Sequence, residues 1–380
     1  MSRFLFMADE IQGSVLVPVF NEERYIEASV MAMRRQQFPG ELEFLFADGG
    51  STDRTREILE RLAQEDPRIR VFDNPRRSVS SGLNVALRHA RGRWAVRMDA
   101  HTIYPDNYIL LGVGRLQAGG TRWVSGPQIP KGHGPVSRAV ALALAGRLGR
   151  GGSSKWGAGA SASGPEFELD TGVFAGVWEL ATLHAYGGWD ERWWCNEDSE
   201  MAARFLAAGE RLICVPAMGA EYMPRDNLGG LWRQYWGYGL YRARTSRHHP
   251  HSMRASHLLA PGMAVVLVSA IVAPRALRRP ARGVVLAYLT CLLGVGGRTL
   301  AAADPRGATA ADPRGAAALV PAVLATMHFG HGFGQLYGWL RHGAPLRAWI
   351  SLLGLEGSLG APPPATARPW APSLTPPAQA

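Results

Sequence analysis

The stretch SVLVPVFNEE, residues 14–23, decides the fold, because an apolar run ends there abruptly in polar residues. A near-continuous apolar run of this length is typical of a parallel strand that is buried on both faces. Ile26, Val30 and Met33 then follow at helical spacing. The stretch therefore predicts a buried strand that passes through a polar turn into a helix.

The same alternation continues along the chain. Further strands are expected at residues 43–47, 69–72 and 94–98, and the segments between them carry apolar residues at helical spacing. This β-α-β-α-β-α-β order predicts an α/β domain with a mostly parallel sheet and helices on both faces. Another strand is expected at 171–178. A helix is expected at 199–208, with Met201, Phe205 and Leu206 inward and Gly209 at its C-cap.

Three acidic clusters mark the candidate site. Asp48 in ADGGSTD and Asp99 in RMDAH each follow an apolar run, and α/β sheets bind ligands at that edge. Asp198 in NEDSE opens an amphipathic helix, where its anion is stabilised and can take a proton from an attacking hydroxyl. Helix capping is the alternative role of Asp198. Together the clusters suit a site for a metal, an anionic nucleotide and a reacting hydroxyl.

The neighbouring residues leave alternatives open. The turn that contains Asn21 and Glu22 could hold a base or ribose, or it could be an ordinary helix cap. Asp48 could accept a hydrogen bond from a nucleobase or a ribose hydroxyl, since Gly49 and Gly50 allow a tight turn. Asp99 and His101 could ligate Mg²⁺ or Mn²⁺ at a diphosphate, although a lone histidine is more often structural.

Composition narrows the class of protein. The 380 residues are 47% hydrophobic and carry a formal charge of +10, which suits anionic lipid or a phosphorylated substrate. The sequence contains no nucleic-acid-binding motif, so no nucleic-acid partner is expected. Three cysteines without metal-ligand spacing favour a reducing compartment. The start, MSRFLFMADE, turns acidic too soon for a signal peptide, and we expect the catalytic part to stay in the cytoplasm.

Three apolar runs follow, at residues 258–273, 283–297 and 315–329. Each is shorter than the roughly 20 residues that cross a bilayer, but flanking residues could extend them. Arginines lie on both sides of the first run, which puts both flanks on the cytoplasmic side. We therefore expect an interfacial or re-entrant first run and a spanning hairpin from the other two. Core helices of a soluble domain are the alternative.

The expected organisation has four parts. Residues 1–225 form the catalytic domain, 226–256 a juxtamembrane linker, 257–342 the hydrophobic helical region and 343–380 a C-terminal segment with a Pro/Ala-rich disordered tail. Residues 149–164 are expected to form a mobile loop near the site or an exposed linker. Residues 302–318 contain a local duplication, which we interpret as a loop expansion without function.

Several motifs in this order resemble family 2 glycosyltransferases of the GT-A fold, a Rossmann-like fold of nucleotide-diphospho-sugar transferases. The match is closer to the branch of proteins similar to the succinoglycan biosynthesis protein ExoA. It runs from about residue 12 to 245 through PVFNEE, DGGSTD, NPRRSVSSGLNVAL, RMDAHTIYP, GGWDE, NEDSE with Arg204, and PRDNLGGLWRQYWGYGLYR. Because the motifs are co-linear, they are far more specific together than any one of them.

The resemblance implies a role for each matching position. The donor-binding residues would be Pro18, Asn21, Glu22, Asp48, Arg77, Asn84 and Asp99. The acceptor-binding residues would be Trp189, Asp190 and Glu197, and Asp198 would be the catalytic base. Asp99 and His101 would hold a divalent metal, Mg or Mn. His101 stands where the common DxD pattern has its second Asp, which puts the identity of the metal in doubt.

The reaction implied is inverting transfer of a sugar from a nucleotide-diphosphate donor, with UDP-glucose as the first guess. The acceptor would be a polyprenyl-diphosphate-linked saccharide of extracellular or cell-surface polysaccharide biosynthesis. The enzyme would contact membrane lipid at the bacterial cytoplasmic membrane, with its catalytic domain facing the cytoplasm. Transfer to a polyprenyl phosphate is one alternative. A non-catalytic membrane scaffold that binds nucleotide sugar is another, and the retained Asp48, Asp99 and Asp198 argue against it.

Overall fold

The computed structural model describes residues 11–151, 153, 155–156, 163–173, 175–302 and 313–355. These residues form two compact units. Unit 1 contains residues 11–126 and 164–218, and unit 2 contains residues 127–163 and 219–355. The expected domain boundaries at residues 225, 256 and 342 stay predictions. Half of the expected loop at 149–164, the centre of the duplication at 302–318 and the C-terminal tail lie outside the described residues.

Unit 1 is built on a mixed sheet of eight strands in the order β3-β2-β1-β4-β9-β6-β10-β8. The neighbours β2, β1 and β4 are parallel, with Val15 of β1 opposite both Phe44 of β2 and Val96 of β4. β9 is antiparallel to β4 and β6, and β8 is antiparallel to β10. The strands are β1 (Ile11–Val19), β2 (Glu41–Asp48), β3 (Ile69–Asp73), β4 (Trp94–Arg97), β6 (Trp123–Ser125), β8 (Phe167–Leu169), β9 (Gly176–Glu179) and β10 (Leu212–Cys214).

The helices expected after the first three strands and at 199–208 are present as α1 (Ile26–Arg34), α2 (Thr55–Glu65), α3 (Val79–His89) and α8 (Glu197–Ala207). The sequence did not predict α4 (Tyr108–Gln117) or α7 (Leu180–Ala185), and a short strand, β5 (Thr102–Ile103), follows β4. Each helix buries one apolar face. In α3, for example, Leu83 and Leu87 join the same core cluster as Met201 and Phe205 of α8. The Ser78 hydroxyl starts α3 by accepting a hydrogen bond from the Ser81 amide.

Two details of the sequence prediction were wrong. β9 begins at Gly176, so the expected strand at 171–178 is shorter than its apolar composition indicated. Leu206 is exposed at the surface of α8, because Met201 and Phe205 already fill the buried face of this helix. The end of α8 agrees with the prediction: Gly209 adopts a φ of 80°, the left-handed conformation that a helix C-terminus favours.

Unit 2 is mainly helical, with two short parallel strands. Its elements are β7 (Gln128–Pro130), α5 (Pro135–Ala145), α6 (Arg147–Arg150), β11 (Ala220–Tyr222), α9 (Leu228–His248), α10 (Leu259–Val272), α11 (Arg275–Ala302), α12 (Pro313–His342) and α13 (Leu346–Leu352). Its core forms where apolar residues of α5, α9, α11 and α12 meet, including Leu144, Leu231, Leu292 and Leu324.

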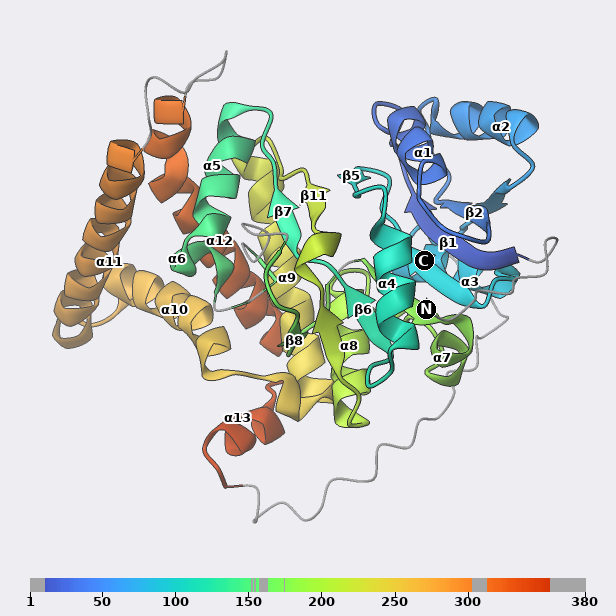
Figure 1. The fold of residues 1–380 in the computed structure, drawn as a ribbon. Coiled ribbons are helices and arrows are strands. Elements are labelled where there is room, and N and C mark those ends of the chain that lie inside the picture. Colours follow the sequence, from blue (N-terminus) through green and yellow to red (C-terminus); the bar gives the residue numbers. More distant parts are fainter. Residues whose placement is uncertain are drawn as a thin grey trace. The chain divides into compact units, whose positions relative to one another are not determined.

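The helices α9 and α12 approach each other closely along their lengths (Figure 1). At Gly334 of α12 an added Cβ would lie 2.2 Å from the carbonyl oxygen of Trp236 in α9. Gly330 and Gly338, one helical turn away on either side, also face α9. This spacing brings the two backbones together in a way that larger residues would prevent.

Within the described part of unit 2, three helical segments are long and apolar enough to cross a membrane: Ala255–Val272, Arg275–Ala302 and Arg314–His342. The last two belong to helices of 28 and 30 residues, so they extend well beyond the apolar runs that the sequence showed. Large apolar side chains such as Ile271, Leu286 and Leu293 are exposed on these helices. Helices that are apolar on their outer face are typical of membrane association.

Candidate active site

The candidate active site lies at the carboxyl ends of β1, β2 and β4, which are adjacent parallel strands. Their connecting loops therefore leave the sheet at one edge. Among the described residues other than glycine, three have positive φ angles: Asn21 (55°), Arg77 (58°) and Asn196 (59°). All three belong to the motifs quoted above. Backbone strain of this kind is concentrated at functional sites, because it aims side chains that a relaxed turn would not.

The loops after β1 and β2 are tied together by side-chain hydrogen bonds. The Asn21 amide nitrogen donates to Ser51 Oγ at 2.9 Å, and Asn21 Oδ1 accepts from the Thr52 amide at 2.8 Å. Asp48 is buried, and its Oδ1 accepts from the amide and the hydroxyl of Ser51. These bonds give Asn21 and Asp48 a structural role, because they hold the two loops together. The sequence analysis expected both residues to bind the donor.

Two further predicted donor residues border the same loops. Pro18 is half-buried at the end of β1, and its Cβ is 3.2 Å from the position that a Cβ on Gly82 of α3 would take. Arg77 is exposed, and its guanidinium nitrogens are 3.7 Å from the position of a Cβ on Gly50. Arg77 thus places a positive charge next to the glycine turn that follows Asp48, which favours an anionic ligand there.

At the end of β4, Asp99 is held by a buried arginine. Arg97 donates from Nε to Asp99 Oδ1 at 2.9 Å and from Nη2 to Asp99 Oδ2 at 3.2 Å. Its Nη1 donates to Glu197 Oε1 at 2.9 Å. Because Arg97 is only 3% exposed, these are strong charge-assisted bonds shielded from water. Arg97 therefore connects the end of β4 with the start of α8.

The electrostatics of this group follow from burial and proximity. Burial lowers the pKa of Arg97, but the charges of Asp99 and Glu197 outweigh it, so the pKa is raised and the guanidinium stays cationic. Burial also raises the pKa of Glu197, with Arg97 opposing and Asp198 adding to the shift. The hydrogen bond from Arg97 Nη1 nevertheless engages the Glu197 carboxylate. Asp198, the next residue, is half-buried.

The start of α8 is fixed from two sides. Asn196, at the N-cap, takes the left-handed conformation, and Glu197 and Asp198 follow as the first residues of the helix. Gly172 packs against them, because a Cβ on it would lie 2.1 Å from the Asp198 carbonyl oxygen. Arg204, one turn before the end of α8, donates to the carbonyls of Tyr186 and Gly188. The position of Asp198 is therefore set by packing and not by a flexible turn.

His101 is paired with a residue from the loop after β1. Its Nδ1 lies 3.0 Å from Glu22 Oε1. The described residues contain no group of three or more His, Cys, Asp or Glu side chains that could hold a metal. Asp99 and His101 would thus supply two ligands at most, which fits a divalent metal whose coordination is completed by substrate phosphates. Glu22, expected at the donor, has His101 as a partner that the sequence did not predict.

The structure corrects the expectation for Trp189. Its ring is 1% exposed and packs in the core at 5.8 Å from the ring of Trp178, so it cannot contact an acceptor. Asn84, expected at the donor, is also buried, and its amide bonds both the amide and the carbonyl of Trp189. These two residues hold the GGWDE loop on α3. Trp194, which is 60% exposed, is the accessible aromatic residue of this segment.

The remaining acidic residues of the GGWDE loop are held by arginines. Asp190 forms a two-point pair with Arg192, with its shortest contact at 2.6 Å. Burial raises the pKa of Asp190, but the hydrogen bonds from Arg192 outweigh it and leave the pKa lowered. Glu191 accepts from Arg76 at 2.6 Å. Asp190 therefore stays ionised, and Arg76 joins Arg77 as a basic residue at the start of α3.

Sequence reasoning missed Arg97, although a signal was present. The strand WAVR, residues 94–97, is otherwise apolar, and all four of its residues are buried. A charged residue in a buried strand requires a partner of opposite charge, because an unpaired buried charge is too costly. Arg97 could have been expected to pair with one of the acidic clusters, but the sequence does not show which.

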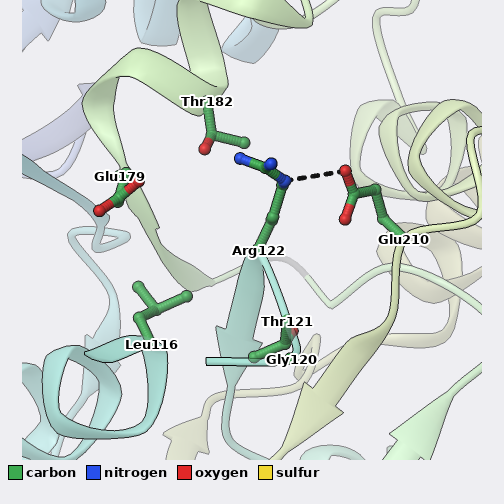
Figure 2. A pocket seen from close by; sticks show the side chains of 7 residues that line it. All are labelled: Leu116, Gly120, Thr121, Arg122, Glu179, Thr182 and Glu210. Carbon is green, nitrogen blue, oxygen red and sulfur yellow. Dashed lines mark ion pairs between the residues drawn. The ribbon is translucent and has the colours of Figure 1, made fainter. Parts of the chain in front are cut away.

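A cavity of about 330 Å³ lies at a different edge of unit 1 (Figure 2). It is lined by the residues before β6 and β10 and by the end of β9, which marks the amino-terminal edge of the parallel strands. Arg122 and Glu210 point toward each other across it and form an ion pair at 2.9 Å. None of the predicted site residues lines this cavity.

Comparison with known proteins identifies the class. Residues 14–150 match the family model described as glycosyl transferase family 2. The chain is 34% identical over 271 residues to the succinoglycan biosynthesis protein ExoA of Rhizobium meliloti, covering 70% of this chain and 80% of the relative. This chain therefore belongs to glycosyltransferase family 2, within its ExoA-like branch.

More distant proteins agree with this result. A glucuronosyltransferase of Methanococcus voltae that acts on a dolichyl N-acetylglucosaminyl phosphate is 31% identical over 100 residues, which cover 26% of this chain and 31% of that protein. The structure of a mannosyltransferase from Pyrobaculum calidifontis, solved with GDP-mannose and Mn²⁺, aligns with a TM-score of 0.54. At 19% identity, covering 86% of this chain and 88% of the other, this likeness shows the GT-A fold.

Proposed function

We propose that this glycosyltransferase moves a sugar, with inversion, from a nucleotide-diphosphate donor to a lipid-linked saccharide in extracellular or cell-surface polysaccharide biosynthesis. The ExoA-like family assignment supports the pathway class. The observation that carries the proposal is the chain of contacts from Asp99 through Arg97 to Glu197, because it joins the donor end of β4 to the helix that bears Asp198. UDP-glucose is the first donor to test.

The proposed chemical step is a single in-line displacement. The acceptor hydroxyl oxygen forms a bond to the anomeric carbon while the bond from that carbon to the diphosphate oxygen breaks. The hydroxyl proton passes to the Asp198 carboxylate, and the nucleoside diphosphate leaves with the bonding electrons. Asp198 suits this role better than Glu197, because Glu197 is buried and bonded to Arg97.

The donor would lie over the loops after β1, β2 and β4. Asn21 and Asp48 shape the nucleoside end, and Arg77 supplies positive charge near Gly50. Asp99 and His101 are the residues that would hold a divalent metal, Mg²⁺ or Mn²⁺. Such a metal, when bound, neutralises charge that develops on the leaving diphosphate. Asp190 and Glu197 stay as proposed acceptor-side residues, with Trp194 in place of the buried Trp189.

The acceptor proposal rests on the apolar helices of unit 2. A polyprenyl-diphosphate-linked saccharide stays in the bilayer, so an enzyme with membrane-associated helices meets it at the headgroups. The arginines that flank the first apolar segment, among them Arg254 and Arg275, favour the cytoplasmic side of a bacterial membrane. In this proposal α11 and α12 form a spanning hairpin, and the segment before α11 is interfacial.

A donor screen tests the proposal. Membranes that contain the full chain receive labelled nucleotide sugars together with either a polyprenyl-diphosphate-linked saccharide or a polyprenyl phosphate. Mass spectrometry identifies the lipid product, and nuclear magnetic resonance of the new linkage gives its anomeric configuration. The expected product is the lipid-linked saccharide extended by one sugar, with the anomeric configuration inverted. A product formed with polyprenyl phosphate alone, or with retained configuration, would contradict the proposal.

A further inference from the structure

We propose that Glu22 is a positioning residue that orients His101 as a metal ligand, and that this pair makes the site select transition metals over Mg²⁺. This inference rests on the proposed function, because it concerns the metal that would accompany the donor diphosphate. It changes the role of Glu22 from a nucleoside contact to a residue that acts through His101.

The first argument is the geometry of the pair. His101 Nδ1 and Glu22 Oε1 are 3.0 Å apart, and the two side chains are 39% and 18% exposed. When Nδ1 donates its proton to a carboxylate, the lone pair of the imidazole lies on Nε2, which is the atom that can then ligate a metal. Histidine ligands are commonly oriented in this way by a carboxylate, which also makes the imidazole more basic.

The second argument is that the backbone holds Glu22 independently of its side chain. The Glu22 amide donates to Thr55 Oγ1 at 2.7 Å, and its carbonyl accepts from the amides of Tyr25 and Ile26. The carboxylate is therefore presented by a fixed turn. Replacing the side chain alone leaves these bonds in place, so a variant at Glu22 reports on His101 and not on folding of the loop.

The third argument concerns the charge of the ligand set. Two carboxylates at these positions would offer the oxygen ligands that Mg²⁺ prefers. Here one position is an imidazole, and Arg97 engages both oxygens of Asp99 and offsets its charge. A nitrogen ligand and a weakened carboxylate favour metals such as Co²⁺ and Mn²⁺ relative to Mg²⁺.

The pair could instead serve as a plain brace between the loops after β1 and β4. A brace would affect thermal stability and leave metal affinity unchanged, whereas an oriented ligand would affect metal affinity. Glu23 provides a matched control, because it is the adjacent residue, is exposed, and its carboxylate accepts a hydrogen bond from the Arg54 amide. The variants Glu22→Gln and Glu23→Gln thus remove the same charge one residue apart.

The experiment measures Mn²⁺, Co²⁺ and Mg²⁺ binding to the detergent-solubilised full chain in the presence of UDP or GDP, without a sugar or acceptor. Electron paramagnetic resonance of bound Mn²⁺ records whether nitrogen-14 of an imidazole is coupled to the metal. We expect that coupling in the wild type and its loss in His101→Asp, which should also lower the preference for Co²⁺ over Mg²⁺ about tenfold. Glu22→Gln should weaken Mn²⁺ binding about tenfold, and Glu23→Gln should not.

The outcomes separate the two proposals. If the wild type binds metal with a nucleotide but shows no nitrogen coupling, or if Glu22→Gln binds metal as Glu23→Gln does, this inference is overturned and the proposed function stands. If the wild type binds no metal with either nucleotide, the proposed donor site is overturned and this inference with it. Equal melting temperatures for the two Gln variants confirm that the comparison concerns the site.

Discussion

The two units of this enzyme handle charge in opposite ways. Unit 1 buries charged groups in ion pairs, as in the contacts of Arg97 with Asp99 and Glu197. In unit 2 the described helices α9 to α13 contain no Asp or Glu, although they carry many arginines and histidines. Their apolar side chains face outward instead.

This difference shows where each unit finds its stability. Buried ion pairs hold the strand ends of unit 1 in one arrangement, because an unpaired charge in that core would be costly. Outward apolar residues and close helix contacts through glycine are the features expected of helices that pack within lipid. The reaction of charged, water-soluble donors and the capture of lipid-linked acceptors would thus be divided between the two units.

The largest expected effect concerns the buried ion pair. Arg97→Met leaves the buried Glu197 and the half-buried Asp99 without their counter-charge and should lower the free energy of unfolding of unit 1 by about 3–5 kcal/mol. Chemical denaturation followed by tryptophan fluorescence measures it, since Trp94, Trp178 and Trp189 lie in this core. Arg97→Lys keeps the charge but loses the two-point geometry, and should cost less. Equal losses for the two variants would contradict the role of charge.

A second prediction contrasts exposed apolar residues in the two units. Leu286→Arg, at an exposed position in the middle of α11, should lower membrane insertion by about 3 kcal/mol. Leu110→Arg, at an exposed position of α4 in unit 1, should leave it unchanged. The measurement is the fraction of each variant that stays in membranes after carbonate extraction. Equal extraction of both variants would argue that α11 does not lie in lipid.

A third prediction concerns the contact between α9 and α12. Gly334→Val would place side-chain atoms against the Trp236 carbonyl and should destabilise unit 2 by about 1–3 kcal/mol. Gly297→Val in α11 is the control, because a Cβ there meets nothing within 4 Å. Thermal unfolding in detergent compares the two. Nucleotide binding by unit 1 should be the same in both variants, and a loss confined to Gly334→Val would show that the units depend on each other.

The smallest effect comes from Asp66 of unit 1, a carboxylate that is 8% exposed and pairs with Arg34 and Arg68. Hydrogen bonds from Arg68, and the nearby charge of Arg34, lower the pKa of Asp66. Its stabilising contribution is therefore present above the unfolded pKa, about 3.9, and is lost as the pH falls toward the folded value. Asp66→Asn should cost less than about 1 kcal/mol at pH 7, and the difference from wild type should shrink below pH 4. A constant difference across this range would contradict the assignment.

The sequence was sufficient for the fold class, because the signals of the first four strands and of the helices between them are local. The apolar runs that end at Asp48 and Asp99 predict strands, and the order of elements predicts a mostly parallel sheet. The family resemblance misled at Trp189, which it placed at the acceptor although the ring is buried, and Asn84, which it placed at the donor, is buried as well. Motif membership does not distinguish a residue that touches a ligand from one that holds the loop, and burial decides that.

Other parts of the site could not be predicted, because they depend on contacts between distant segments. The pairing of Glu22 with His101 joins residues 79 positions apart, and that of Arg97 with Glu197 joins residues 100 apart. Nothing in either local sequence selects its partner. The sequence did flag His101 as unusual, and the structure supplied the carboxylate that accompanies it.

The central claim is that Asp198 removes the acceptor proton at an edge where Asp99 holds the donor. It is tested most directly by measuring transfer and donor binding for Asp198→Asn in one preparation. The account predicts a loss of kcat of about 10²–10⁴-fold with donor affinity unchanged, since the amide cannot accept the proton. Full transfer activity in Asp198→Asn, or a loss of donor binding that explains the fall in rate, would contradict it.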